Sequence, residues 1–348
     1  MRHILQLTLV GLLLFLLLSA CNYSIQQQAK IGQNNSSTTA NTAIRIIKHP
    51  LGETKVPIYP QRVVVLHGFM WTDALAVGVK PIGAPLKISL IQPTNEQRQN
   101  VVDVGFLPNN LEKILAIKPD LILGVAEQQK DIYPLLSHIA PTVLIEVKNV
   151  RDWKDHFMQV ANALNKTEEA QKVISNYHSR LQKFRANARL DAKPLIGRHR
   201  LSDTPVLVVG LYNGNCRIFS WEENSFSGGI IEEAGLTLKP TPSQLNKLQK
   251  SGIYSISWER LDLVDNSIIF VSPSHFWFSN SDVEEYHKAF KELQTMPLWS
   301  KLKSVQQGKV YPVKVHWVGN GPIAANHVLD DLFKYLLNYS SPKSFVKN

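Results

Sequence analysis

The stretch "NKTEEAQKVISNYHSRLQKFRANARLDA", residues 165–192, predicts one long amphipathic helix in the middle of the chain. Its apolar residues recur at the three- and four-residue intervals of a single helix face. They are Ala170, Val173, Ile174, Tyr177, Leu181 and Phe184. Asn165 and Glu168 suit a capping box at its start, and Pro194 and Gly197 break the helical pattern after it. We therefore expect a rigid strut over residues 165–193 rather than a flexible linker.

Short apolar runs rich in β-branched residues lie on both sides of this helix, and each is followed by a helical pattern. These runs are residues 62–66, 120–124, 142–147, 205–211, 267–272 and 309–313. Continuous apolarity indicates strands buried on both faces, which is typical of parallel sheets. The sequence thus predicts an α/β fold of two lobes with mainly parallel sheets, residues 43–164 and 194–340, bridged by the long helix.

The two halves also resemble each other. "NLEKILAIKPDLILG" (110–124) aligns without a gap with "SWERLDLVDNSIIFV" (257–271), so that Glu112 meets Glu259 and Leu121 meets Ile268. In each copy a short helix with a glutamate near its start is expected to lead into a buried strand. Two similar lobes would carry these two glutamates on corresponding surfaces.

The N-terminus has the features of an export signal. A basic start precedes an apolar tract, Leu9 to Ala20, that is shorter than the ~20 residues needed to span a bilayer. The following "LSAC" resembles the bacterial lipobox, and this resemblance implies that residues 1–20 are cleaved and that Cys21 becomes lipid-modified. A plain signal peptide with a chance cysteine and an uncleaved anchor are the alternatives.

Residues 21–42 are rich in Gln, Asn, Ser and Thr, and nearly free of large apolar side chains. Such a segment cannot bury enough surface to offset the entropy of ordering, so we expect a flexible tether between the anchor and the first lobe. Residues 341–348 form a short C-terminal tail.

Several motifs in a shared order resemble the iron–siderophore substrate-binding lipoproteins of ABC importers. They are "QRVVVL", "DALAVGVKPIGA", "VVDVG", "NLEKILAIKPDLILG", "LSHIAPTV", "ISWERL" and "PLWSKLKSVQQGKVYPV". The resemblance implies a ferric siderophore held between two helix-bridged lobes and delivered to an ABC permease dimer. It implies a monomeric, exported protein, lipid-anchored to the cell membrane and facing the periplasm or cell exterior. The siderophore is its ligand, and no cofactor or bound metal of its own is implied.

In this family one glutamate on each lobe docks onto arginines of the permease. The corresponding motifs read "NLEK" and "SWER" here, so the resemblance assigns permease docking to Glu112 and Glu259. The alternative is that both are ordinary carboxylates at helix N-termini, where the helix dipole favours them.

The ligand is expected where the carboxyl ends of the strands of both lobes face each other. Aromatic side chains, which bury much area at low entropic cost, are frequent in the segments that follow the strands. The candidate ligand contacts are His67, Phe69, Trp71, Arg217, His275, Trp277 and Trp317. Arg217 would suit a negatively charged chelate, and Trp317 matches a pocket tryptophan of the ferric-hydroxamate binder. Core packing for the aromatics and a solvated surface position for Arg217 are the alternatives.

The formal net charge is +10. We do not expect nucleic acid as a partner, because the chain is predicted to be exported and has no basic cluster with a known nucleic-acid-binding motif. Positive charge could instead steer anionic chelates toward the protein, or reflect an acidic membrane surface or cell wall.

Three other functions remain open from the sequence. A binder of bare Zn²⁺ or Mn²⁺ would need several His and carboxylate ligands, and His67, His275 and His316 lie in suitable segments. A binder of another chelate, such as haem or cobalamin, would share the fold. An exported hydrolase, such as a siderophore esterase, would need an activated nucleophile, but the chain has no G-x-S-x-G motif, so we expect no enzyme.

Overall fold

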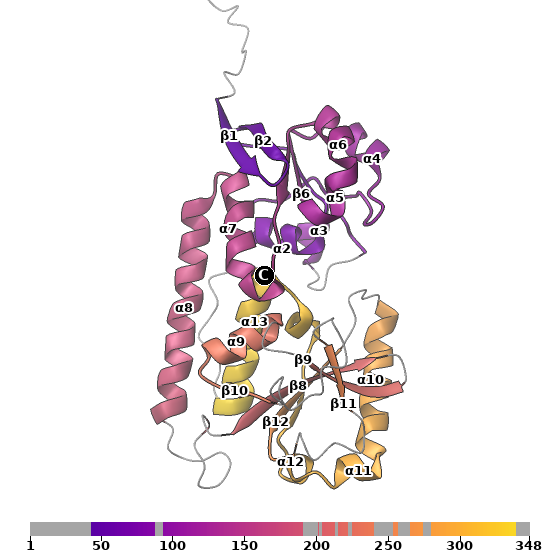
Figure 1. Cartoon of the computed structure of the whole chain (residues 1–348), viewed down its shortest axis with the longest axis vertical. Coiled ribbons are helices and arrows are strands. Elements are labelled where there is room, and N and C mark those ends of the chain that lie inside the picture. Colours follow the sequence, from indigo (N-terminus) through magenta and orange to yellow (C-terminus); the bar gives the residue numbers. More distant parts are fainter. Residues whose placement is uncertain are drawn as a thin grey trace, which may run out of the picture. The chain divides into compact units, whose positions relative to one another are not determined.

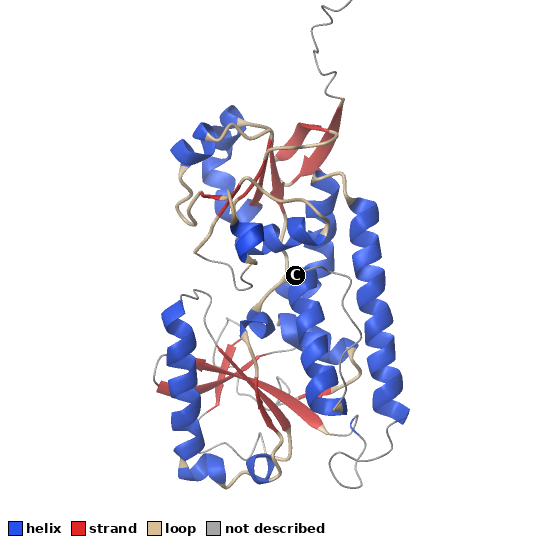
Figure 2. Cartoon of the chain, turned by 180° about the vertical axis from the view of Figure 1, so that it is seen from behind, coloured by secondary structure: helices blue, strands red, loops and turns tan. Residues whose placement is uncertain are grey.

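The computed structural model describes residues 43–87, 93–190, 201, 204–212, 215–221, 225–239, 253–256, 265–273 and 280–338. Within these residues the chain forms two α/β lobes and a long helix between them in sequence (Figures 1 and 2). The predicted fold class is confirmed.

The N-terminal lobe is built on a five-stranded, fully parallel sheet of order β5-β4-β3-β6-β7. The strands are β3 (Val63–Val65), β4 (Gly83–Ala84), β5 (Val102–Asp103), β6 (Leu121–Val125) and β7 (Thr142–Ile145). Val63 pairs with Leu121, and Ile122 with Thr142.

Successive residues of these strands enter two different cores. Val63, Val65 and Leu121 face helices α2 (Gly68–Ala76) and α7 (Trp153–Ala163). Val64 and Ile122 lie in a second cluster with residues of α4 (Leu111–Ala116) and α6 (Tyr133–Ile139). Both faces of the sheet are therefore covered, which is why the strands are continuously apolar. The shorter elements of this lobe are α3 (Asn95–Arg98), α5 (Ala126–Gln129), η1 (Lys130–Ile132) and η2 (Val150–Asp152).

An antiparallel hairpin precedes this sheet. Its strands are β1 (Ile44–His49) and β2 (Gly52–Pro57). The Thr54 hydroxyl donates to the Thr142 carbonyl over 2.8 Å, which ties the hairpin to β7. This hairpin was not predicted from the sequence.

Helix α8 (Thr167–Leu190) is the predicted long helix. Its expected start was wrong, because Asn165 ends the preceding helix instead of capping α8. Asn165 is left-handed (φ 57°), its N–H donates to the Asn162 carbonyl, and the Lys166 N–H donates to the Ala161 carbonyl. This pair of bonds is the Schellman motif, for which asparagine is one of the few suitable residues after glycine.

The C-terminal lobe has a six-stranded mixed sheet of order β11-β9-β8-β12-β13, with β10 also paired to β8. The strands are β8 (Pro205–Tyr212), β9 (Asn215–Trp221), β10 (Thr237–Leu238), β11 (Ile253–Ile256), β12 (Ile268–Pro273) and β13 (Val310–Pro312). β8, β10, β12 and β13 are parallel, whereas β9 pairs antiparallel with β8, and β11 pairs antiparallel with β9. Tyr212 ends β8, and residues 215–217 belong to β9.

The helices of this lobe also cover two sheet faces. Leu207 and Ile269 face α10 (Asn280–Thr295) and α11 (Pro297–Ser300). Val208 and Phe270 face the opposite core, which α9 (Phe226–Glu233), η5 (Val315–Val318) and α13 (Gly321–Leu337) share. The short helix α12 (Lys303–Gln306) precedes β13.

The predicted internal repeat is confirmed for its strands. Leu121 of β6 pairs with the first strand of its sheet, at Val63, and Ile268 of β12 pairs with Val206 in the same way. One residue later, Ile122 and Ile269 pair with the next parallel strand on the other side. The two halves of the repeat thus occupy equivalent places in the two sheets.

One continuous core joins the lobes. It contains buried residues of β3, β6, β8 and β12 together with those of α2, α7, α8, α9 and α13. Helix α13, although last in the sequence, packs against α8 and against α2 and α7 of the N-terminal lobe. Figure 1 shows α8 running beside α7 and α13.

Polar contacts reinforce this junction at its surface. Arg151 pairs with Glu232 of α9 at 2.6 Å, and Lys154 of α7 pairs with Glu233 at 2.5 Å. The Tyr177 hydroxyl of α8 donates to the same Glu233 over 2.7 Å. Burial, and secondarily Glu233, raise the pKa of Tyr177, so the phenol stays protonated and donates. Residues of α7, α8 and α9 therefore meet at one carboxylate.

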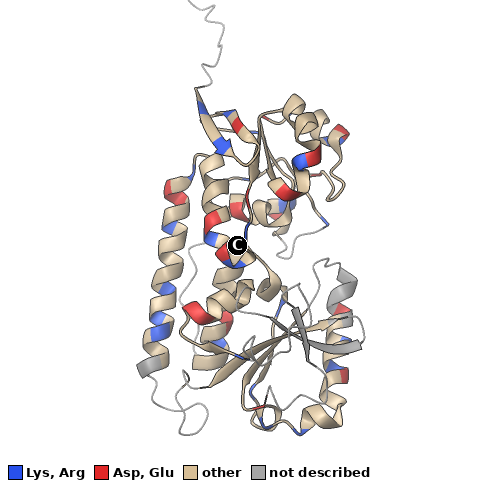
Figure 3. Ribbon diagram, in the orientation of Figure 1, with Lys and Arg blue, Asp and Glu red and all other residues tan. Residues whose placement is uncertain are grey.

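Charges of both signs are interspersed over the helices of both lobes (Figure 3). In the described part of the chain, no helix has the length and apolarity needed to cross a membrane.

Candidate functional site

The carboxyl end of strand β3 leads directly into helix α2. His67 is the N-cap of this helix, and its Nδ1 accepts the Phe69 N–H over 3.3 Å. The segment 67–71, which follows a strand as expected, is therefore a cap followed by the first turn of a helix. The helix orients Phe69 and Trp71 in different directions.

His67, Phe69 and Phe106 form a partly exposed group at this edge of the sheet, here termed the N-lobe aromatic face. The ring of His67 lies 4.3 Å from that of Phe69 and 5.1 Å, edge-on, from that of Phe106. Phe106 was not predicted as a ligand contact, although it follows β5 closely and so belongs to the same carboxyl edge. Two of the predicted ligand residues are thus brought together with a third aromatic ring.

The His67 imidazole is neutral at physiological pH. Burial, with a smaller contribution from nearby His156, lowers its pKa from 6.5 to about 4. A neutral Nδ1 is also what the N-cap requires, because a protonated Nδ1 could not accept the Phe69 N–H. The face consequently offers carbon-rich rings without a fixed charge.

Protonation of His67 should make the protein less stable in acid. The unfolded chain takes up this proton near pH 6.5 and the folded chain only near pH 4. Stability is therefore lost as the pH falls through this window, by about 3 kcal/mol at most. Replacing His67 with asparagine keeps a side-chain acceptor for the cap but removes the titration, so its unfolding free energy should change less between pH 7 and 4. Urea unfolding at several pH values measures this.

The matched control is His138→Asn, which replaces an exposed histidine of α6. It should keep the acid sensitivity of the parent protein. Asp73 has the opposite effect on stability, because burial raises its pKa above the ordinary value of 3.8. Its contribution to the free energy of unfolding is present at low pH and is lost as the pH rises through the pKa of the folded state. Since both variants retain Asp73, the difference between them isolates His67. Equal pH dependence in His67→Asn and the parent would contradict the assignment.

Trp71 and Trp317 do not lie on an exposed wall. Trp71 is 0% exposed in the core between α2 and its neighbouring helices, because α2 turns Met70, Trp71 and Ala74 inward. Trp317 is 1% exposed, stacks on Phe270 of β12 at 4.4 Å, and donates its Nε1–H to Asp331 Oδ2 over 2.8 Å. Both indoles are therefore packed in the core, which was the alternative to ligand contact for each of them.

Other predicted residues fall outside what the structure describes. Arg217 belongs to strand β9, but its side chain is not among the described ones. Cys21, Glu259, His275 and Trp277 lie outside the described residues, as do the predicted signal, tether and tail. Their roles stay predictions.

Glu112 occupies the first turn of α4 and is exposed. The cap of this helix is supplied by Asn110, whose side chain accepts the Lys113 N–H over 2.9 Å. Glu112 therefore does not itself cap the helix, which leaves its carboxylate directed to the surface for another use.

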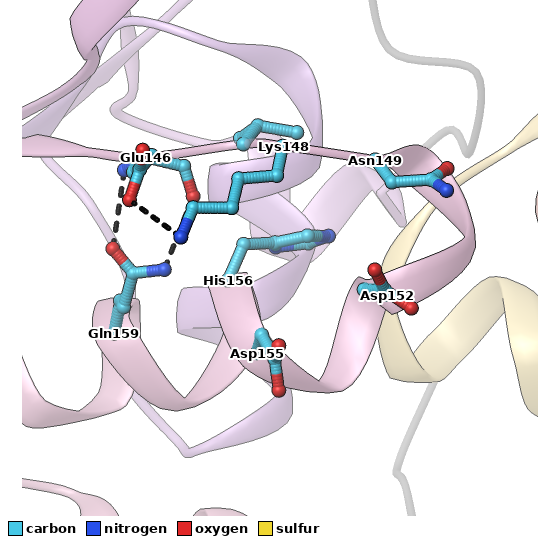
Figure 4. A pocket seen from close by; sticks show the side chains of 8 residues that line it. Glu146, Lys148, Asn149, Asp152, Asp155, His156 and Gln159 are labelled. Carbon is cyan, nitrogen blue, oxygen red and sulfur yellow. Dashed lines mark hydrogen bonds and ion pairs between the residues drawn. The ribbon is translucent and has the colours of Figure 1, made fainter.

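A polar hollow lies beyond the carboxyl end of strand β7 (Figure 4). Its volume is about 90 Å³, and it is lined by Glu146, Val147, Lys148, Asn149, Asp152, Asp155, His156 and Gln159. The Gln159 side chain bridges the N–H and carbonyl of Glu146, and Lys148 pairs with Glu146 at 3.5 Å. Among the described residues, no group of three or more His, Cys, Asp or Glu side chains is placed to hold a metal ion.

Comparisons with known proteins agree with this architecture. A sequence profile described as "Periplasmic binding protein" matches residues 63–314. A protein of Bacillus subtilis named "Probable siderophore-binding lipoprotein YfiY" is 31% identical over 97% of this chain and 98% of its own length. "Fe(3+)-citrate-binding protein YfmC" of the same organism is 28% identical over 87% of this chain and 86% of its own.

Among solved structures, Staphylococcus aureus SirA complexed with staphyloferrin B superposes with a TM-score of 0.67 at 24% identity. The superposition covers 84% of this chain and 98% of that one. At this identity the likeness supports the fold.

Proposed function

Because the chain belongs to the periplasmic binding protein family, we propose that it captures a ferric siderophore outside the cytoplasm and delivers it to an ABC permease for iron uptake. The observation that carries this proposal is the full-length similarity to a relative named as a siderophore-binding lipoprotein. The relatives matched are named as binding proteins. The siderophore is accordingly cargo rather than a cofactor.

The N-lobe aromatic face suits such a ligand. A ferric siderophore completes the coordination of its iron itself, so the protein needs walls rather than metal ligands. Phe69, Phe106 and neutral His67 supply apolar rings that lose little entropy on binding. Arg217, His275 and Trp277 remain the proposed contributions of the C-terminal lobe.

Titration of tryptophan fluorescence with purified ferric siderophores tests the function. The panel holds citrate, hydroxamate and catecholate types, each with and without iron. We expect saturable binding of at least one ferric complex and weaker binding of its iron-free form. Recovered siderophore should be chemically intact, whereas fragments would indicate a hydrolase.

The same assay carries the competing ligands as controls. Zn²⁺, Mn²⁺, haem and cobalamin are titrated under identical conditions. Binding of one of these, without binding of any ferric siderophore, would replace the proposal with the corresponding alternative function.

We propose that Cys21 anchors the protein through lipid. Replacing Cys21 with serine should move the protein from the membrane fraction to the soluble fraction, because acyl chains hold by burial of CH₂ groups, ~0.8 kcal/mol each. Fractionation after a high-salt wash measures this, since salt removes proteins held only by charge.

Cys216→Ser is the matched control, because it removes the other cysteine of the chain and leaves the anchor in place. This variant should remain with the membranes. Retention of the Cys21→Ser protein in washed membranes would count against the lipid anchor.

We also propose that the monomer docks onto a permease dimer through Glu112 and Glu259. The equivalent sheet positions of Leu121 and Ile268, each nine residues after its glutamate, support a pseudo-symmetric arrangement of the two carboxylates. A pseudo-two-fold pair suits a partner with two equivalent subunits.

A further inference from the structure

A buried polar bridge joins α2, α7 and the start of α13. His156 of α7 lies at its centre, with Nδ1 3.2 Å from Asp73 Oδ2 of α2 and Nε2 2.9 Å from Asn320 Oδ1. The His156 side chain is 1% exposed and that of Asp73 0%. Asn320 is the N-cap of α13, the helix that packs against the helices of the N-terminal lobe.

The hydrogen bonds fix where the protons of this bridge lie. Asn320 Oδ1 also accepts the Gly321 N–H over 2.9 Å, so the Nε2–H of His156 donates to it. Nδ1 and Asp73 Oδ2 must then share one proton, as imidazolium with carboxylate or as imidazole with carboxylic acid. Both forms are neutral overall, and loss of either partner would leave a buried group unpaired.

The backbone of Gly321 approaches the same carboxyl group closely. Gly321 has φ of 83°, and a Cβ atom there would collide with Asp73 Oδ1. The first residue of α13 is thus placed directly against Asp73, and only glycine leaves the required space. Helix α2 and the start of α13 are held in contact by packing as well as by hydrogen bonds.

His156 also contacts the N-lobe aromatic face. Its ring centroid lies 4.6 Å from that of Phe69, whose other neighbour is His67. On a further side His156 borders the polar hollow, where Glu146, Asp152 and Asp155 are lining residues (Figure 4). One side chain therefore touches the candidate ligand face and the junction between the lobes.

We propose that His156 is a positioning residue for ligand binding, which sets the N-lobe aromatic face and the start of α13 in one fixed arrangement. This inference rests on the proposed function. His156 acts through Phe69 on one side and through Asp73 and Asn320 on the other. Preorganisation of this kind raises affinity because less order has to be imposed when the ligand binds.

Ligand affinity of the full-length variants tests the proposal. His156→Leu removes both hydrogen bonds, and we expect its Kd for the ferric siderophore bound by the parent protein to rise about ten-fold or more. Asp73→Asn keeps the bridge, because the amide of asparagine can donate to a neutral Nδ1, and its Kd should stay close to that of the parent. If His156 only filled space, the Kd values of His156→Leu and Asp73→Asn should be similar.

Leu293→Ala controls for lost stability. Leu293 of α10 is fully buried in the other core of the C-terminal lobe, which contains Leu207 and Ile269 but no residue of the bridge. It should lower the melting temperature while leaving Kd unchanged. A Kd for His156→Leu no higher than that of Leu293→Ala overturns the inference while the proposed function stands.

Hydrogen exchange of the ligand-free proteins separates this inference from the proposed function. Amides of residues 315–321 and of α2 should exchange about ten-fold faster in His156→Leu than in the parent, and not in Asp73→Asn. Unchanged exchange in His156→Leu overturns the bridge without reference to any ligand. If the parent binds no ferric siderophore, the proposed function and the positioning role both fail, and the exchange data still report whether the bridge holds the lobes.

Discussion

Replacing Trp317 with alanine is expected to lower the free energy of unfolding by about 3–5 kcal/mol. The indole is 1% exposed, stacks on Phe270 at 4.4 Å and donates to Asp331 over 2.8 Å. Its removal leaves a cavity between β12 and α13 and costs a buried hydrogen bond. For a chain of this size the melting temperature should fall by roughly 10 °C. Urea and thermal unfolding measure both quantities.

Trp317→Phe is the informative companion. A phenyl ring keeps much of the stacking on Phe270 but cannot donate to Asp331, which still accepts from His316 Nε2 over 2.8 Å. The free energy of unfolding of Trp317→Phe should therefore be lower than that of the parent by about 1–2 kcal/mol. If instead Trp317→Ala melts like the parent and loses siderophore affinity, Trp317 is the ligand wall that the sequence suggested, and its buried position does not describe the ligand-binding state.

The sequence predicted the parts of the fold that depend on local pattern. Continuous apolar runs such as 205–211 became strands buried on both faces, because no position in them has to face water. The repeat predicted more than secondary structure, since Leu121 and Ile268 occupy matching registers in separate sheets. The long helix was equally clear, because its apolar stripe packs against the helices beside it.

The errors occurred where two elements meet at one residue. Asn165 carries an N-cap signal and a left-handed C-terminal signal, and the second prevails because α7 ends at Ala163, two residues earlier. Residues 67–71 were expected to supply several ligand contacts after a strand, although Met70, Ala74 and Val77 already have helical spacing. With α2 recognised, Trp71 would have been placed in the core and Phe69 at its margin.

The bridge around His156 could not be predicted from a single sequence. Its partners lie 83 and 164 positions away, and the motif that begins with Asp73 does not indicate a contact with His156 or Asn320. Only the packing of α13 onto α2 and α7 brings them together. Phe106 differs, because its place after β5 could have been read once that short strand was recognised.

Removing both Glu112 and Glu259 should reduce siderophore uptake by cells about ten-fold or more, because two charge-assisted contacts to the permease are lost together. Ligand affinity of the purified Glu112→Ala/Glu259→Ala protein should match that of the parent. Its melting temperature should change little, since Asn110 rather than Glu112 caps α4. Loss of a first-turn carboxylate alone costs about 0.3–1 kcal/mol. Uptake of labelled ferric siderophore, affinity and melting temperature are measured on the same variants.

The single variants and a matched glutamate separate docking from general effects of charge. Each single variant should transport better than the double variant, because the other lobe keeps its contact. Glu96→Ala removes an exposed first-turn glutamate from α3 of the same lobe, and it should transport like the parent. Docking by these carboxylates is wrong if the double variant transports normally. If uptake falls only in proportion to a lower melting temperature, the two glutamates stabilise the N-termini of their helices instead. This is the alternative that the sequence left open.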